Sequence, residues 1–96
     1  MFKTGIIGYG KSGRDIHANA LKKVPDKYTV AAVTDRLSFR REMAGKELGA
    51  NTYENYQDML AGENLDIIIN ASFSHEHFPI TLDLLKRGCT VVSDKP

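Results

Sequence analysis

The chain has 96 residues, of which 42% are hydrophobic and 26% charged, as is usual for one globular domain. Its net charge of +1 is too small for a surface that holds a phosphate backbone, so nucleic acid is not an expected partner. The first residues lack the apolar stretch and the cleavage site of a signal peptide, and no apolar run reaches the roughly 20 residues that a membrane span needs. Cys89 is the one cysteine, so we expect a cytoplasmic domain without membrane contacts or disulfides.

Segments typical of strands and of helices alternate along the whole chain. Short runs rich in β-branched or apolar residues predict strands, and segments with apolar residues at three- or four-residue spacing predict helices. In chain order these are a strand at 2–7, a helix at 12–24, a strand at 28–34, a helix at 38–48, a very short strand at 52–53, a helix at 56–61, a strand at 66–71, a helix at 77–87 and a strand at 90–93.

Apolar stripes on the predicted helices should face the sheet. Glycines follow three of the helices, where a left-handed residue is favoured, and Pro79 falls in the predicted first turn of the last helix. The expected inward residues are Ile16, Ala20 and Val24 in the first helix, Phe39, Met43, Ala44 and Leu48 in the second, and Phe78, Leu82 and Leu85 in the last; the closing glycines are Gly49, Gly62 and Gly88.

The alternation predicts an α/β fold with a doubly wound parallel sheet, because strands joined through helices pair in parallel with right-handed crossovers. The strand at 66–71 is apolar on both faces, as in the middle of such a sheet. The chain stops at Pro96, directly after its fifth strand, so we expect residues 1–96 to be the first domain of a longer protein whose substrate domain lies outside this chain. The open edge at 90–93 predicts pairing with a second copy, and hence a homo-oligomer.

Residues 8–13 form the motif G-x-G-x-x-G between a predicted strand and a predicted helix. Gly8 permits a tight turn, Gly10 lets a pyrophosphate approach the backbone, and Gly13 lets the helix pack closely on the strand. The helix N-terminus then offers N–H groups to an anion. This context predicts a Rossmann-like dinucleotide-binding domain over 1–96 in preference to a purely structural turn, with contacts from Gly8, Tyr9, Gly10, Lys11, Ser12 and Gly13.

Asp35 ends the second predicted strand, 22 residues after Gly13. An acidic residue about 20 residues after the glycines accepts hydrogen bonds from the adenosine ribose and repels a 2′-phosphate, which favours NAD over NADP. Arg36 leaves NADP possible, because its guanidinium could hold a 2′-phosphate. It could instead stack on the adenine. Arg40 and Arg41 are expected to be solvated helix charges.

The loop after the fourth strand lies where open parallel sheets bind ligands, beyond the carboxyl ends of the strands. We therefore expect Ser72, Phe73 and His77 to contact the cofactor, with a purely local hydrogen bond as an equal alternative for His77. His75 and His77 do not predict a metal site, because residues two apart on a helix do not face each other.

Asp94 and Lys95 follow the last strand at the same edge of the sheet, where they are candidate cofactor contacts. An ammonium at this place can polarise a hydroxyl or carbonyl oxygen or transfer a proton, which makes Lys95 the candidate catalytic residue. By position alone, Lys95 could equally be an exposed lysine at a chain end.

One set of segments extends along essentially the whole chain: 5–14, His17, 32–35, His77-Phe78, 84–88 and 91–96. In these segments the chain resembles the glucose-fructose oxidoreductase, inositol dehydrogenase and rhizopine catabolism (Gfo/Idh/MocA) family. The resemblance implies a nicotinamide-dependent oxidoreductase that transfers hydride to or from a sugar, polyol or related carbonyl, with Lys95 in the active site. It also implies that the other catalytic residues lie in a later domain, so this chain alone should bind cofactor without turnover.

Two departures and two rival functions accompany this interpretation. Asp94 stands where the family usually has Glu, and Phe73 where a proline is common. A non-catalytic NAD(H)-binding sensor is the alternative function, and nothing before Lys95 distinguishes it from half of an enzyme. A methyltransferase also uses a glycine-rich first turn and an acidic residue, but Gly13 and the Asp-Lys-Pro ending disfavour it.

Overall fold

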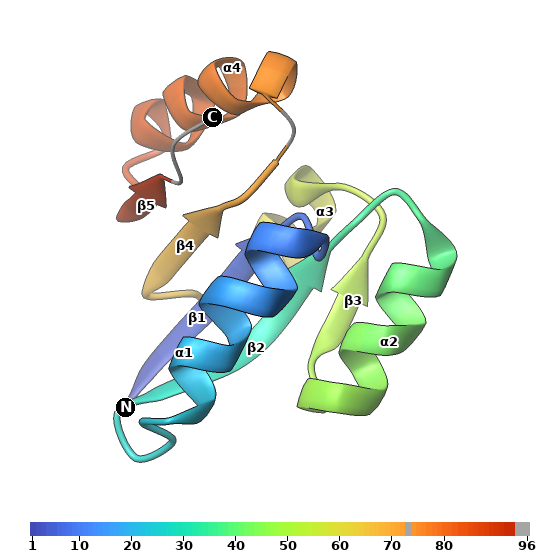
Figure 1. Ribbon diagram of the computed structural model, residues 1–96. Coiled ribbons are helices and arrows are strands. Elements are labelled where there is room, and N and C mark those ends of the chain that lie inside the picture. Colours follow the sequence, from blue (N-terminus) through green and yellow to red (C-terminus); the bar gives the residue numbers. More distant parts are fainter. Residues whose placement is uncertain (73, 94–96) are drawn as a thin grey trace.

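Five parallel strands form one sheet in the order β3-β2-β1-β4-β5. The computed structural model in Figure 1 describes residues 1–72 and 74–93 of the chain. The order reverses between β1 and β4, which is where a doubly wound sheet opens a crevice for ligands. The strands are β1 (Phe2–Ile7), β2 (Tyr28–Thr34), β3 (Asn51–Tyr53), β4 (Ile67–Asn70) and β5 (Val91–Ser93).

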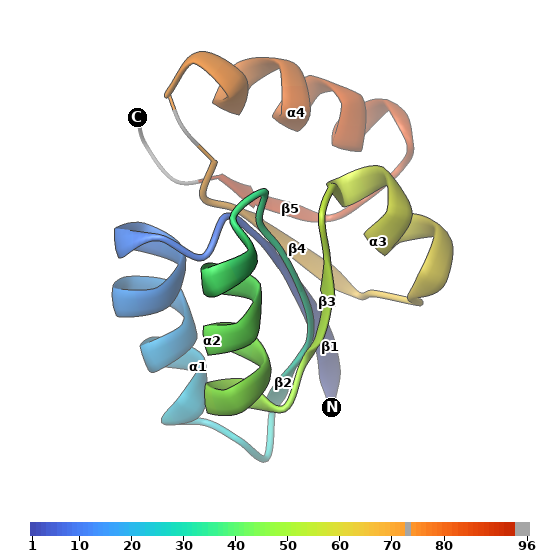
Figure 2. The same cartoon turned by 90° about the vertical axis from the view of Figure 1, so that its right-hand side faces the viewer.

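Helices cover both faces of this sheet, as Figure 2 shows. The first helical segment has π-type hydrogen bonds and continues directly into α1. It packs with α2 on one face, over a core that contains Ile6, Val33 and Ala44, while α3 and α4 pack on the other, over Ile7, Met59 and Leu84. The helices are η1 (Lys11–Ala18), α1 (Asn19–Lys22), α2 (Ser38–Leu48), α3 (Tyr56–Gly62) and α4 (Ser74–Lys86).

The predicted fold class is confirmed, and the bounds of β1, β2 and α2 agree with the sequence prediction. Gly49 is left-handed after α2, with a φ of 65°, as a helix C-terminus favours. Gly62 differs from its prediction, because it is the last residue inside α3 and not the residue after it. The fourth helix begins at Ser74, three residues before its predicted start, so Pro79 lies in its second turn.

The predicted inward faces of the helices are partly wrong. Phe78 is 72% exposed, and Leu82 and Leu85 are also exposed, because α4 turns His77, Ile80 and Leu84 toward the sheet instead. A regular spacing of apolar residues identifies a stripe, but other residues of α4 make the contact with the sheet.

The first and second helices show the same kind of error. Ile16 and Ala20 are exposed, and Ala18 and Leu21 pack against the core in their place. In α2, Phe39 is exposed whereas Met43, Ala44 and Leu48 face the core as predicted. Among the described residues, none of the helices combines the length and the apolar character that a membrane span requires.

Candidate functional site

The carboxyl ends of β1, β2 and β4 lie at one edge of the sheet and are joined there by backbone hydrogen bonds (Figure 1). The N–H of Gly8 donates to the carbonyl of Thr34 at 2.7 Å, and the N–H of Ala71 donates to the carbonyl of Ile7 at 2.9 Å. These bonds fix the turn after β1 between the ends of β2 and β4. The three loops predicted to bind a dinucleotide are therefore side by side.

The glycine turn is packed so closely that two of its positions exclude a side chain. Gly8 has a φ of 91°, and a Cβ there would lie 2.7 Å from the carbonyl oxygen of Ala71. A Cβ on Gly13 would lie 1.8 Å from the carbonyl oxygen of Gly8. Gly13 therefore sets the close approach of η1 to the end of β1, which is the packing role predicted for the third glycine.

The start of η1 is suited to an anion. Its N-cap is Gly10, which has no side chain to cap the helix, and no acidic residue lies in the first turn. The N–H groups at a helix start and the helix dipole favour negative charge. This end of η1 fits the pyrophosphate of a dinucleotide. The structure describes the backbone of Lys11 and Ser12 but not their side chains.

Asp35 joins the end of β2 to the glycine turn. It is buried, and its Oδ2 accepts a hydrogen bond of 2.9 Å from the N–H of Tyr9, while its Oδ1 accepts one of 3.0 Å from the N–H of Leu37. Each carboxylate oxygen can accept two hydrogen bonds. The carboxylate is thus oriented by the backbone and keeps acceptor capacity for a ribose hydroxyl.

Two arginines of α2 surround Asp35, and the prediction that they are solvated charges is wrong. Nη1 of Arg40 lies 3.6 Å from Oδ2 of Asp35, and the same guanidinium is 3.1 Å from where a Cβ on Gly10 would be. Nη1 of Arg41 donates to the carbonyls of Asp35 and Arg36. The structure therefore places the guanidinium of Arg40 against the glycine turn and that of Arg41 at the end of β2.

Tyr9 has its side chain in the core, with 1% exposure, so only its backbone can take the predicted part in cofactor binding. Its hydroxyl donates to Oε1 of Glu47 at 2.7 Å, and Arg14 donates to both oxygens of the same carboxylate. Burial and the bond to Glu47 raise the pKa of Tyr9 well above its ordinary range. The bonds from Arg14 and Tyr9 lower the pKa of Glu47 to about 2. This network attaches the glycine turn and η1 to α2.

On the other side of the turn, Asn70 organises the loop after β4. Its side chain is completely buried at the end of β4. The amide nitrogen donates to the carbonyl of His77 at 3.0 Å and to Oγ1 of Thr81 at 2.8 Å, and the amide oxygen accepts from the N–H and the hydroxyl of Ser72. All four hydrogen-bonding positions of the amide are used.

His77 extends this network to β5. Its Nε2 lies 2.6 Å from Oγ of Ser93, which in turn lies 3.3 Å from Oγ1 of Thr81. Residue His77 is 7% exposed, and its Nδ1 is buried without a hydrogen-bond partner among the described residues. The ring is engaged locally, which corresponds to the local alternative; a direct contact with the cofactor remains a prediction.

A surface ion pair joins the β2 side of the site to the β4 side. Nη2 of Arg36, just after β2, lies 3.2 Å from Oε1 of Glu76 in the first turn of α4. The Arg36 side chain is 64% exposed, so water weakens this pair. Arg36 therefore points across the site and not only toward the ribose position at Asp35.

Some predicted site residues cannot be placed, and some residues of the site were missed. Phe73, Asp94 and Lys95 lie outside the described residues. Asn70, Thr81 and Ser93 were not predicted. The available signal was a polar residue directly after the apolar run 67–69, since a buried amide must find partners.

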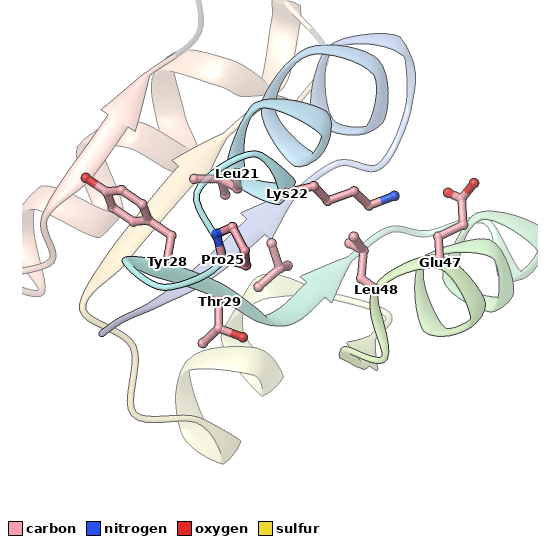
Figure 3. A pocket seen from close by; sticks show the side chains of 8 residues that line it. Leu21, Lys22, Pro25, Tyr28, Thr29, Glu47 and Leu48 are labelled. Carbon is pink, nitrogen blue, oxygen red and sulfur yellow. The ribbon is translucent and has the colours of Figure 1, made fainter.

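A shallow hollow of about 200 Å³ lies at the opposite end of the sheet (Figure 3). It lies between the end of α1, the start of β2 and the last turn of α2, with Leu21, Tyr28 and Leu48 among its lining residues. The glycine turn contributes nothing to it, so the hollow is separate from the candidate dinucleotide site.

Comparison with known proteins identifies the family. Residues 2–96 match the model of the Gfo/Idh/MocA oxidoreductase family, described as having an NAD-binding Rossmann fold. The chain belongs to this family. It is 31% identical over 96 residues to inositol 2-dehydrogenase/D-chiro-inositol 3-dehydrogenase of Lactiplantibacillus plantarum and 30% identical to the rhizopine catabolism protein MocA of Rhizobium meliloti. These two matches span 98% and 99% of this chain, but only 27% and 29% of the two relatives.

Solved structures of the family have the same fold. The WlbA dehydrogenase of Chromobacterium violaceum, solved with NADH and UDP-GlcNAcA, matches with a TM-score of 0.92 at 26% identity over 99% of this chain and 27% of that one. The scyllo-inositol dehydrogenase of Lactobacillus casei, solved with NAD(H) and scyllo-inositol, matches with a TM-score of 0.84 at 28% identity over 95% of this chain and 27% of that one. The expected family and Rossmann-like fold are thereby confirmed, and the chain spans little more than a quarter of these relatives.

Proposed function

We propose that this chain binds NAD(H) at the carboxyl edge of its sheet and is the cofactor-binding part of an oxidoreductase that transfers hydride to or from a sugar, polyol or related carbonyl. The observation that supports this most directly is the hydrogen bond from the N–H of Tyr9 to Oδ2 of Asp35. It holds the candidate ribose acceptor beside the glycine turn, so that one ligand can reach both.

The charges at the site favour NAD over NADP. A 2′-phosphate on the adenosine ribose would meet the carboxylate of Asp35, and like charges at short distance repel. Arg40 offsets part of this repulsion from 3.6 Å, but Arg36 is engaged with Glu76 on the other side of the site. We therefore infer a preference for NAD(H) that depends on Asp35.

The substrate class and the catalytic role of Lys95 rest on the family. The inositol 2-dehydrogenase/D-chiro-inositol 3-dehydrogenase and the D-glucoside 3-dehydrogenase to which this chain is similar are named for polyol and sugar substrates. Lys95 would then polarise the reacting oxygen near the nicotinamide. Scanning polyols and sugars for NAD⁺ reduction by the longest expressed form of the protein tests the class, and Lys95→Ala should abolish any reduction found.

Titration of the chain with NADH and with NADPH, followed by nicotinamide fluorescence, tests the cofactor assignment. We expect saturable binding with NADH tighter than NADPH. Asp35→Asn should lower the affinity for NADH by about ten-fold, because a hydrogen bond to a charged acceptor is lost. It should lower the affinity for NADPH by less.

The matched control is Asp26→Asn, which makes the same change of charge at an exposed turn between α1 and β2. It should leave both affinities unchanged. Binding of neither nucleotide would overturn the proposed cofactor site, and an Asp35→Asn variant with an unchanged preference would overturn the role of Asp35.

A further inference from the structure

We propose that His77, Thr81 and Ser93 form a clasp that positions the end of β5 for the nicotinamide half of the cofactor, with His77 and Ser93 as positioning residues. The inference rests on the proposed function, since it assigns a part of that same site. It concerns the hydrogen bond between Nε2 of His77 and Oγ of Ser93, which joins the first turns of α4 to the last residue of β5.

The clasp joins the buried ring of His77 to the half-buried Thr81 and the exposed Ser93, each with defined partners. Ser93 contacts both Nε2 of His77 at 2.6 Å and Oγ1 of Thr81 at 3.3 Å, and Thr81 accepts from the buried amide of Asn70. A continuous path of hydrogen bonds thus runs from Asn70 at the end of β4 to Ser93 at the end of β5. The same amide of Asn70 holds Ser72 in the loop after β4.

The strand order indicates which half of the cofactor this network serves. Asp35 at the end of β2 is the ribose acceptor of the adenosine half, and the glycine turn after β1 is the pyrophosphate site. Continuing across the sheet in the order β2-β1-β4-β5, the remaining half of a dinucleotide lies over the ends of β4 and β5. The clasp joins these two strands at that edge.

The backbone alone holds the end of β5 weakly. The strand has three residues and pairs only with β4 among the described elements, so one of its edges is open. Ser93 is its last residue and precedes the candidate catalytic Lys95 by two positions. A side-chain hydrogen bond to α4 at this point fixes where the chain leaves the sheet.

The missing hydrogen bond at Nδ1 of His77, within the described part of the chain, indicates that this histidine does more than fill space. The nitrogen is buried without a partner among the described residues, which is unfavourable for a ring nitrogen. An apolar side chain at this place would avoid that cost, as Leu84 and Ile80 do on the same face of α4. We therefore attribute the presence of a histidine here to the hydrogen bond between its Nε2 and Oγ of Ser93.

The test compares NADH with ADP-ribose, which contains the adenosine and pyrophosphate groups but no nicotinamide. Ser93→Ala removes one hydroxyl from an exposed residue and should leave the chain folded. We expect this variant to bind NADH about five-fold more weakly, the usual effect of losing one hydrogen bond. Its affinity for ADP-ribose should be unchanged. Ser93→Thr retains the hydroxyl and should restore NADH binding, and Thr90→Ala, a hydroxyl deletion at an exposed residue just before β5, is the matched control.

Amide hydrogen exchange gives a readout that does not depend on the cofactor. We expect the amide of Val92, the neighbour of residue 93 in β5, to exchange at least about five times faster in Ser93→Ala and in His77→Phe, which keeps the ring volume but lacks both nitrogens. Unchanged exchange and unchanged NADH affinity in Ser93→Ala would overturn the clasp, as would equal weakening of NADH and ADP-ribose, which indicates a structural role only. If the wild-type chain binds neither ligand, the proposed function fails, and faster exchange then shows a clasp that serves the fold without serving a nicotinamide.

Discussion

The sharpest prediction concerns Gly13, where the structure leaves no space for a methyl group. In Gly13→Ala the new Cβ would lie 1.8 Å from the carbonyl oxygen of Gly8, whereas contacts below 3.0 Å are essentially never seen for a Cβ. The obstructing atom belongs to the backbone, so no side chain can rotate away. The start of η1 must therefore move away from β1 by roughly 1 Å or more, which repacks the core beneath it.

Overpacking of this kind destabilises a fold by up to about 3 kcal/mol. For a domain of this size a loss of about 3 kcal/mol corresponds to a fall in Tm of about 12–24 °C. The displacement also moves the N–H groups at the start of η1, so NADH affinity should fall at least about ten-fold. Thermal unfolding by circular dichroism gives the first quantity, and nucleotide titration gives the second.

Gly45→Ala is the matched control, because it adds the same methyl group inside α2, where nothing lies within 4 Å of the new Cβ. Alanine in a helix interior is more stable than glycine by roughly 0.5–1 kcal/mol, so this variant should unfold a few degrees above the wild type. The two variants should thus shift Tm in opposite directions. A Gly13→Ala variant with wild-type Tm and NADH affinity would refute the close packing of η1 on the glycine turn.

Two further predictions test the networks and faces described above. The pKa of Glu47 is lowered to about 2 by Arg14, so its contribution to stability is present above the ordinary pKa of glutamate and is lost as the pH falls toward 2. Acid unfolding should therefore be less steep below about pH 4.5 in Glu47→Gln than in the wild type, while Glu42→Gln, at an exposed position of the same helix, should behave as the wild type. Leu84→Ala should lower the free energy of unfolding by about 2–5 kcal/mol because Leu84 is fully buried. Leu85→Ala, at a residue with 57% exposure, should change that free energy by less than about 0.5 kcal/mol. Similar losses for the two variants in denaturant unfolding would contradict the assigned face of α4.

The fold was largely predictable because its signals are local. The β-branched run at 28–34, the helical spacing at 38–48 and the glycine after it each depend on a few neighbouring residues, and the structure has these elements where they were expected. Parallel pairing then follows from the alternation of strands and helices. The glycine motif was equally local, and it leads from the end of β1 into the first turn of η1.

The face of α4 was not predictable in the same way. Phe78, Leu82 and Leu85 have a clear apolar spacing, yet they are exposed, and His77 is buried in their place. A histidine becomes a tolerable inward residue only when it finds a partner, and that partner, Ser93, lies 16 residues further along the chain. Periodicity contains no information about such a distant bond.

Arg40 shows the same limit at the other side of the site. On a helix of mixed charges it looks like any solvated arginine, and only the folded chain places its guanidinium between Asp35 and Gly10. The acidic residue of the dinucleotide motif was identified from spacing alone, but the cation beside it was not. On the proposed function, the preference between NAD(H) and NADP(H) would depend on this pair, of which the sequence pattern indicates only Asp35.

The two sides of the proposed site differ in a way that suits the two halves of a nicotinamide dinucleotide. The adenosine and pyrophosphate side has charged groups, Asp35 and Arg40, where a fixed anion and a ribose must be recognised. Among the described residues, the β4 and β5 side has the neutral amide and hydroxyls of Asn70, Thr81 and Ser93, and Glu76 on the β4 side is paired with Arg36. A nicotinamide ring is cationic when oxidised and neutral when reduced, so each charged side chain beside it favours one form over the other. On the proposed function Lys95 would favour the reduced form, and neutral groups around it keep that difference small. Neutral groups can hold both forms, and on the proposed function this lets the same site accept the cofactor before hydride transfer and release it afterwards.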